Sequence, residues 1–243
     1  RDCLLSRGLG DVYKRQAKKC KVSSLEEAGI SIINMNGIYF TRFMQLYNGY
    51  KLNIPSKGEK ESKTTYAERI KIFMKREGSY EPSEYTKVSS IPQRCVALTD
   101  NDPPKDSALP QKGEHLKGEN PFLYYKDQSA AMTNNCRVFV NSKTFEYDLA
   151  IESHHNAKIM LETLLSEISS KIRQDKIKEY IDMINSDTVS DDAQMSYFIL
   201  TQIESSEIGK GLFAQLLSDA IDDEFDIPLY IIEAIDFMLG IEK

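Results

Sequence analysis

The sequence predicts an α/β fold with a helical C-terminal extension, and three observations support this prediction. Short β-branched runs alternate with helical stretches over the first 150 residues, which is typical of a mostly parallel sheet. From residue 144 onward nearly every segment has helical periodicity. No window approaches the roughly 18 consecutive apolar residues of a membrane-spanning helix, so we expect no membrane association.

The first elements can be placed from their apolar patterns. Residues 24–29 are predicted to be the end of a short helix closed by glycine, and residues 30–34 a compact strand. Residues 38–47 have apolar side chains at helical spacing, which predicts an amphipathic helix. Further strands are predicted at 95–99 and 137–140.

The residues between these elements are predicted to be inserted sequence and loop. We interpret about 55–90 as a basic insertion around one helical stretch at 66–76. Residues 51–76 carry eight basic and three acidic side chains, a local charge of +5 (8 − 3). Such a run is usually a solvated surface, although it also has the charge that phosphate contacts need. Residues 105–125 contain Pro and Gly without a period, which indicates a loop.

The C-terminal part is predicted to be helical. Helices are expected at roughly 144–170, 174–185, 190–204, 209–222 and 228–239. A heavy apolar stripe in this part is expected to be core or a subunit interface, and we expect a homo-oligomer. The stripe comprises Ile159, Met160, Leu161, Leu164, Leu165, Ile168 and Ile172.

The net charge and the cysteines indicate which classes of protein this chain does not belong to. A formal net charge of −6 argues against a nucleic-acid coat or a basic membrane-surface protein, because phosphate affinity comes mainly from Lys and Arg. Residues 204–243 carry ten acidic and two basic side chains, a local −8 (2 − 10). Cys95 and Cys136 each begin an apolar run, where a free thiol behaves as a small core residue. No Cys-x-x-Cys pair or signal peptide is found, so we expect a cytoplasmic protein.

The strongest local signal for chemistry is VALTDND, which places Asp100 and Asp102 directly after a predicted parallel strand. Open α/β sheets bind ligands at this edge. Paired carboxylates suit a hard cation such as Mg²⁺, whereas the structural interpretation is a turn that leads into Pro-Pro. An EF-hand is excluded because Pro104 would stand at the fifth position of its loop and the required Gly is absent.

One resemblance built on these aspartates is to phosphatases of the haloacid-dehalogenase type. Their pattern continues with a strand ending in Ser or Thr, a distant Lys and a late acidic pair, to which Ser142, Lys210 and Asp222-Asp223 can be fitted. The chain departs from this pattern at two places. Pro104 stands where Thr or Val is usual, and the late acidic pair lies in a helical pattern rather than after a strand.

A second resemblance covers more of the chain. VALTDND, SKTFEYDLA, and KGLFAQLL upstream of DIPLYIIEAIDF resemble the C-terminal nuclease region of the OLD (overcoming lysogenization defect) family, which contains a TOPRIM domain. SLEEAGISIINMNGIYFTRF is similar to that region's second strand and following helix. The resemblance implies a TOPRIM-like, mostly parallel sheet over 17–150, interrupted by the basic insertion, and a helical extension over 151–243.

The OLD-family resemblance implies hydrolysis of DNA phosphodiesters with Mg²⁺ or Mn²⁺. By match, Asp100 and Asp102 are metal ligands. Glu146 is a further metal-site carboxylate that takes part in catalysis, and Thr144 is a supporting hydroxyl. Lys210 stabilises charge on the scissile phosphate, and two metals about 4 Å apart activate water and stabilise the leaving oxygen. Without the resemblance, Glu146 is a first-turn helix residue and Lys210 a solvated lysine.

The same resemblance implies that parts of the intact enzyme are missing. A TOPRIM domain begins with a strand ending in Glu, but no VEG-like block occurs, and Glu26 and Glu27 come too late. Where that strand is expected, residues 1–16 resemble translated sequencing-adapter read-through, so we expect them to be a non-native artefact and the first strand to be missing. No Walker A pattern occurs. The resemblance therefore implies that ATP is bound by an N-terminal ATPase domain, which is absent here and is an expected partner of this region. We therefore expect a fragment of an ATP-dependent endonuclease, with DNA bound by the intact protein and little or no nuclease activity in the fragment.

Two further interpretations concern other classes of function. The alternative to an enzyme is a helical assembly or partner-binding module whose acidic residues are structural. His154 and His155 suggest a metal site, but adjacent residues on a helix do not face the same point, so joint ligation is not expected.

Overall fold

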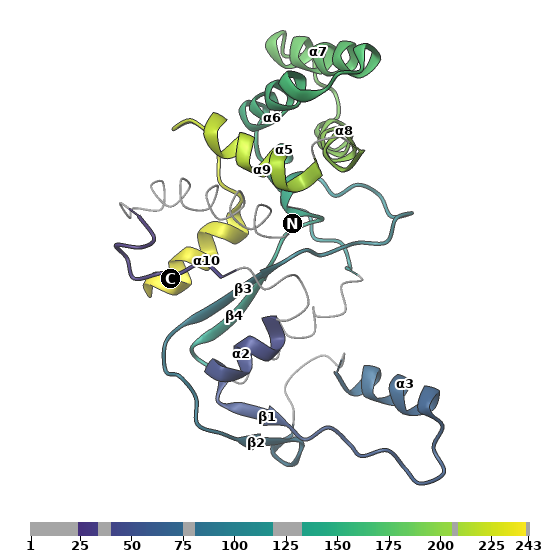
Figure 1. Ribbon diagram of the computed structural model, residues 1–243, viewed down its shortest axis with the longest axis vertical. Helices are drawn as coiled ribbons and strands as arrows, with labels where there is room; N and C mark the ends of the chain where they lie inside the picture. The colour runs from purple at the N-terminus through teal and green to yellow at the C-terminus, as the bar shows by residue number, and fades with distance from the viewer. Residues whose placement is uncertain (1–23, 34–39, 75–80, 119–132, 206–208, 242–243) are drawn as a thin grey trace.

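The computed structural model gives the chain a mixed α/β fold (Figure 1). It describes residues 24–33, 40–74, 81–118, 133–205 and 209–241. The expected artefact at 1–16 lies outside these ranges. Within them, no helix has both the length and the apolar character that crossing a membrane requires.

Two parallel strands form the centre of the fold. β3 (Cys95–Thr99) and β4 (Cys136–Val140) pair in register, with Cys95 opposite Cys136. Both cysteines are free and buried, which confirms their prediction as core residues. The predicted strands at 95–99 and 137–140 are also confirmed, although the described residues add no third strand to this sheet.

Different helices cover the two faces of the sheet. α2 (Phe40–Asn48) covers one face, where the buried Met44 joins a cluster with alternate side chains of both strands. α10 (Leu229–Leu239) packs against β3 and β4 from the other side, where the ring centroids of Phe139 and Phe237 are 6.4 Å apart. Alternation along each strand directs successive side chains to these opposite layers.

Two arginines hold the C-terminal end of α10 against the sheet. The guanidinium carbons of Arg94 and Arg137 each lie 5.0 Å from the ring centroid of Phe237, and Arg94 donates a hydrogen bond to the carbonyl of Phe237. α10 then ends at Gly240 in the left-handed conformation (φ 74°). Cations are favourable both over an aromatic face and at a helix C-terminus, so these contacts stabilise this end of α10.

Five further helices pack together beyond the carboxyl end of β4 (Figure 1). They are α5 (Phe145–Glu152), α6 (His154–Glu167), α7 (Lys171–Asn185), α8 (Asp192–Ser205) and α9 (Gly209–Ala220). These helices confirm the predicted helical extension, with one difference at its start, where the single helix expected at 144–170 is divided into α5 and α6.

The division between α5 and α6 has a local cause. Ser153 is extended (φ −158°, ψ 158°), and its hydroxyl accepts a hydrogen bond from the backbone N–H of Asn156 at 3.2 Å. This contact caps the N-terminus of α6 and satisfies a donor that a continuous helix would have bonded to its own backbone. An apolar periodicity that continues across the break does not reveal such a cap.

The predicted apolar stripe is confirmed as core from α6 to Ile168, which directly follows that helix, but not at Ile172. Met160, Leu161 and Leu164 are fully buried, and they join a large cluster with side chains of α5, α8, α9 and α10. Ile172, which was expected to belong to the same stripe, lies on α7 and is 84% exposed. The break between α6 and α7 places it on a different face.

The segment before α2 differs from its prediction. Residues 25–29 form one turn, closed by Gly29 at φ 74°, and the N–H of Ile30 bonds to the carbonyl of Leu25 at 2.8 Å. This is the hydrogen bond of a glycine-terminated helix end, as predicted. The strand expected at 30–34 is not formed by the described residues 30–33, because they pair with no strand of the described chain.

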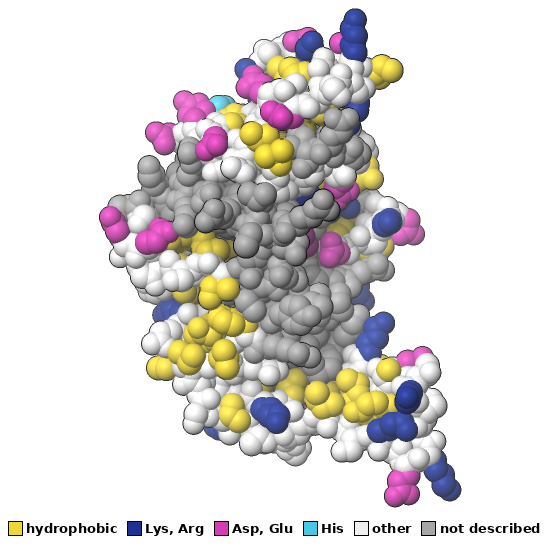
Figure 2. All heavy atoms as spheres, viewed as in Figure 1, with side chains coloured by type: hydrophobic (Ala, Val, Ile, Leu, Met, Phe, Trp, Pro, Cys, Tyr) yellow, Lys and Arg dark blue, Asp and Glu magenta, His cyan; other side chains and the backbone are white. Residues whose placement is uncertain are grey.

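The predicted basic insertion at about 55–90 and the residues just before it contain structure of their own. β1 (Tyr50–Leu52) pairs antiparallel with β2 (Tyr85–Lys87), which follows the 3₁₀ turn η2 (Pro82–Glu84), and α3 (Lys63–Met74) lies between the two strands in sequence. Strands of three residues are too short to show a period, which explains why the sequence did not indicate them. Figure 2 shows hydrophobic side chains on the surface at this end of the molecule, where Leu46, Ile54 and Ile72 are exposed.

We predict that Asn156→Ala lowers the free energy of unfolding by roughly 2–4 kcal/mol. The fully buried Asn156 donates to the carbonyls of Leu149 and Asp226 at 2.9 Å each and accepts from the N–H of Asp226 at 2.8 Å, so truncation leaves buried groups unpaired. Urea denaturation measures the change. Glu162→Ala, at an exposed position of the same helix, is the control, and equal losses in the two variants would contradict the prediction.

Candidate functional site

The site is built from the two segments that follow β3 and β4. Because the strands are parallel, residues 100–102 and 141–144 leave the sheet at the same edge. The second segment leads directly into α5, so the N-terminus of that helix also lies at this edge. Asp100, Asp102, Thr144 and Glu146, four of the predicted site residues, lie in these segments or in the first turn of α5.

Asp100 is held by two hydrogen bonds to one of its oxygens. Its Oδ1 accepts from the side-chain amide of Asn141 at 2.5 Å and from the backbone N–H of Phe145 at 3.1 Å. Burial raises the pKa of Asp100 to about 6, and the negative charges of Glu146 and Asp102 add to this effect. The hydrogen bond from Asn141 and the charge of Lys210 oppose the rise without cancelling it.

The structure therefore brings the four predicted charged residues into one electrostatic group. Asp102 follows on the same loop, where its N–H bonds to the carbonyl of Lys143 at 3.2 Å. It has a left-handed backbone (φ 48°), which Asp tolerates better than most residues. The side chain of Asp102 is exposed, so it lies at the solvent side of the group.

Glu146 and Lys210 form an ion pair beside Asp100. Glu146 is 8% exposed in the first turn of α5, and its Oε2 lies 3.3 Å from the Nζ of Lys210 on α9. Lys210 also lies 3.3 Å from Glu204 of α8. Burial alone would lower the pKa of the Lys210 ammonium, but the two carboxylates outweigh burial and raise its pKa. Lys210 therefore remains charged at neutral pH, as stabilisation of an anionic phosphate requires.

Thr144 has a different contact from the one implied by the resemblance. Its hydroxyl accepts a hydrogen bond from the N–H of Tyr147 at 3.4 Å and so caps α5. An N-cap satisfies one of the free N–H groups of the first helical turn. In this arrangement Thr144 supports the site by fixing the helix that carries Glu146.

Two asparagines that sequence reasoning missed connect the segments. Besides donating to Asp100, Asn141 accepts a hydrogen bond from the backbone N–H of Asn101 at 3.0 Å. The side chain of Asn101 donates to the carbonyls of Ser142 at 3.1 Å and Leu116 at 2.8 Å. Both asparagines are at most 5% exposed. Their position directly at the strand ends was the only sequence signal available.

A second buried carboxylate, that of Asp148, binds the segment 141–144. Asp148 accepts from the N–H and hydroxyl of Ser142, at 2.8 and 2.7 Å, and from the N–H of Lys143 at 3.2 Å. Burial raises the pKa of Asp148, although the hydrogen bonds from Ser142 and Lys143 oppose the rise. Sequence reasoning gave Asp148 no role, even though it lies in the quoted block SKTFEYDLA.

A long loop without regular secondary structure borders the site. The contacts that fix residues 101–118 include the hydrogen bond from Asn101 to Leu116 and the one from the hydroxyl of the fully buried Tyr147 to the carbonyl of Pro110 at 2.8 Å. This agrees with the loop predicted at 105–125, as far as residue 118. The hydrogen bond from the N–H of Asp102 to the carbonyl of Lys143 keeps Asp102 next to the start of α5.

The donor chemistry fits a hard divalent cation, but the side chains are not arranged as a finished metal site. Asp100, Asp102 and Glu146 supply the carboxylate oxygens that Mg²⁺ and Mn²⁺ prefer. Within the described part of the chain, however, no three acidic, His or Cys side chains are placed so that they hold one ion. The cationic partner of Glu146 in this arrangement is Lys210.

The histidine pair is used for other contacts. His154 Nε2 lies 2.8 Å from Asp192 at the start of α8, whereas His155 Nε2 lies 2.9 and 3.0 Å from the two oxygens of Asp222 after α9. Adjacent histidines therefore bind two different carboxylates, which confirms that they do not point to one ligand. The hydrogen bond from His155 also lowers the pKa of Asp222.

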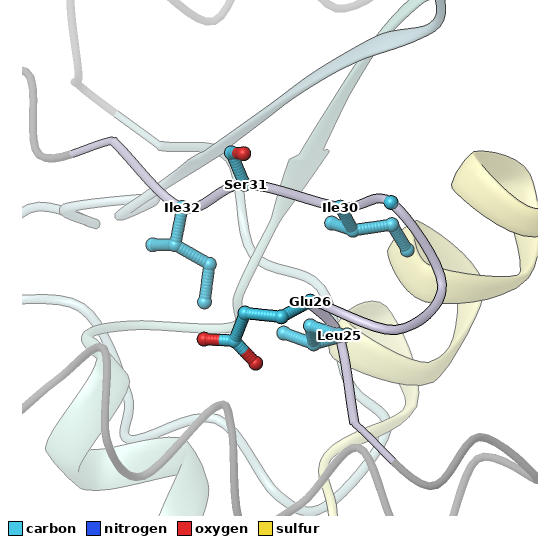
Figure 3. Close-up of a pocket in the computed structure, with 6 residues that line it drawn as sticks. Leu25, Glu26, Ile30, Ser31 and Ile32 are labelled. Atoms are coloured by element: carbon cyan, nitrogen blue, oxygen red, sulfur yellow. The ribbon is translucent and has the colours of Figure 1, made fainter.

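A cavity of about 340 Å³ lies against the N-terminal turn (Figure 3). Apolar side chains and the carboxylate of Glu26 surround it. Its described lining is Leu25, Glu26, Gly29, Ile30, Ser31 and Ile32. None of these residues belongs to the predicted site, so this cavity gives no support to a role for Asp100.

Comparison with known proteins identifies no relative. No protein-family model, no curated protein and no solved structure matches the chain. The resemblance to the OLD family therefore stays a hypothesis that rests on the sequence blocks quoted above.

We predict that Asp100→Asn stabilises the metal-free protein at pH 8 by roughly 1–3 kcal/mol but has little effect at pH 4. Between pH 3.8 and about 6 the folded Asp100 binds more protons than the unfolded one, so the free energy of unfolding falls as the pH rises through this window. Urea denaturation in EDTA at both pH values measures the effect. The exposed Asp106→Asn is the control, and equal changes at the two pH values would count against the raised pKa.

Proposed function

We propose that this chain carries the cation-binding part of a TOPRIM-like nuclease domain, in which Asp100, Asp102 and Glu146 bind Mg²⁺ or Mn²⁺ for hydrolysis of DNA phosphodiesters. The observation that carries the proposal is electrostatic. Glu146 and Asp102 both raise the pKa of the buried Asp100, and Lys210 opposes them. The residues that the resemblance selects from three separate sequence blocks are thus neighbours in space.

A group of carboxylates that repel one another is stabilised by a cation. Repulsion and burial both disfavour the charged form of Asp100. A divalent ion removes this penalty, and when bound it also acts as a Lewis acid on a phosphoryl oxygen. Perturbed carboxylates gathered at the carboxyl edge of parallel strands are the arrangement that such chemistry uses.

The chain's own residues contribute orientation and charge. The hydrogen bonds from Asn141 and Phe145 fix the carboxylate of Asp100. The ammonium of Lys210 is held between Glu146 and Glu204, where it stabilises negative charge that develops on a phosphate. Glu146 would hold the ion in place of its present contact with Lys210, and the Lys210 ammonium would then be available to a phosphate.

The phosphatase alternative has less support. The hydroxyl of Ser142, its expected strand-end group, donates to the buried Asp148. Asp222, its late acidic residue, pairs with His155. Both groups are therefore engaged in contacts other than the one with a phosphate that this alternative requires. A purely structural helical module remains the outcome if no cation binds.

Cation binding is the first test of the proposal. We expect Mn²⁺ titrated into the metal-free chain to bind with heat detected by calorimetry, and Asp100→Ala and Glu146→Ala each to weaken binding by at least about tenfold, because each removes a ligand. Asp106→Ala on the exposed loop is the matched control and should bind normally. Equal binding by all four proteins would refute the site.

Plasmid nicking tests the chemistry separately. Because no VEG-like block occurs in the sequence, we expect little or no Mg²⁺- or Mn²⁺-dependent nicking of supercoiled plasmid by this chain. Cation-dependent nicking that disappears in Asp100→Ala would contradict the expected inactivity and would directly support the proposed site. Nicking that persists in that variant would place hydrolysis elsewhere.

We further predict that Lys210→Met increases the affinity for Mn²⁺ by roughly fivefold, equivalent to about 1 kcal/mol. The ammonium occupies Glu146 and repels a divalent ion, so its removal favours the cation. Calorimetric titration measures the change. Lys176→Met, which breaks an exposed ion pair with Glu179, is the control, and weaker binding by Lys210→Met would contradict the prediction.

A further inference from the structure

We infer that Asp148 is a positioning residue for the carboxylate of Asp100, an inference that rests on the proposed function. Asp148 lies on α5, two residues after Glu146. It binds Ser142 and Lys143 in the loop that joins β4 to α5 (residues 141–144). The loop in turn binds Asp100 through Asn141. Asp148 therefore acts on the site through the loop.

The first link is the set of three donors around Asp148. Oδ2 accepts from the N–H of Ser142, and Oδ1 accepts from the hydroxyl of Ser142 and the N–H of Lys143. Asp148 is 9% and Ser142 is 4% exposed, so water does not readily replace these bonds. Hydrogen bonds to a carboxylate are stronger than neutral ones, and losing them in a buried place is costly.

The second link is the position of Asn141, the residue directly before Ser142. Its side-chain amide donates to Asp100 Oδ1 at 2.5 Å, and its side-chain oxygen accepts the N–H of Asn101 at 3.0 Å. A change in the backbone at Ser142 moves Asn141 and with it both contacts. The hold of Asp148 on the loop thus decides where the carboxylate of Asp100 points.

A carboxylate is specifically required at this position. The loop presents only donors to Asp148, namely two backbone N–H groups and one hydroxyl. An amide side chain has one acceptor oxygen and an NH₂ group that is itself a donor. Asp148→Asn therefore places a donor against donors and shifts the loop, while it changes the side-chain volume very little.

Amide hydrogen exchange in EDTA tests the structural link without any cation. The reporters are the N–H groups of Asn101 and Phe145, which bond to Asn141 and Asp100 respectively. In Asp148→Asn we expect both to exchange at least about tenfold faster relative to amides of α7. Ser153→Ala, which removes the N-cap of α6, is the control that loses stability without releasing the loop.

Mn²⁺ titration tests the consequence for the site. Loss of a group that orients a ligand typically costs about 10–100-fold in metal affinity. We expect a loss in this range for Asp148→Asn and none for Ser153→Ala at temperatures where both are folded. Asn141→Ala should show a similar loss, and the double variant no more than either alone, because both act on the same contact.

A milder variant keeps the test decisive if Asp148→Asn fails to fold. Ser142→Ala removes only the hydroxyl bond of 2.7 Å and should give the same changes at smaller size. Unchanged exchange at Asn101 and Phe145 in a folded Asp148 or Ser142 variant would overturn the inference, as would additive losses in the double variant. Faster exchange with no Mn²⁺ binding by the unsubstituted chain would refute the proposed function and leave the structural link intact.

Discussion

The parallel pairing of β3 with β4 is the interaction on which the rest of the site depends. The register from Cys95–Cys136 to Thr99–Val140 makes both strands end at the same edge. Asn141 then joins the two ends, because one side chain bonds to Asp100 and to the backbone of Asn101. The N-terminus of α5 adds the N–H of Phe145 to the same carboxylate. The helices on either face keep this edge in place by covering the strands.

The two buried carboxylates at this edge, Asp148 and Asp100, have different electrostatic surroundings. Asp148 is surrounded by donors from the loop, which is how proteins satisfy an acidic group inside the fold. Asp100 accepts two hydrogen bonds but also faces the charges of Glu146 and Asp102. Lys210 offsets part of that repulsion. The first environment stabilises structure, whereas the second leaves charge that a cation can neutralise.

The parts of the fold that follow from local pattern were predictable, and those that depend on distant contacts were not. The run before Asp100 predicted a strand, and the helical spacing after residue 144 predicted the helices. The break at Ser153 was missed because one hydroxyl contact decides it. Asn141 was missed because its contact with Asp100 joins residues 41 positions apart, and nothing in either neighbourhood indicates that distance. Residues 30–33 have the composition of a strand but no described partner to pair with.

Repulsion at Asp100 also bears on whether the acidic group is merely structural. A buried carboxyl with a pKa near 6 is charged at neutral pH at the expense of stability, so an amide of the same shape would be the more stable residue there. An amide would not serve equally well at Asp148, because the donors around it require an acceptor with two oxygens. The structural need at the strand ends is thus already met by Asn141, Asn101 and Asp148. Asp100 adds repulsion to an edge that these residues already hold together, and the divalent cation proposed above would relieve that repulsion.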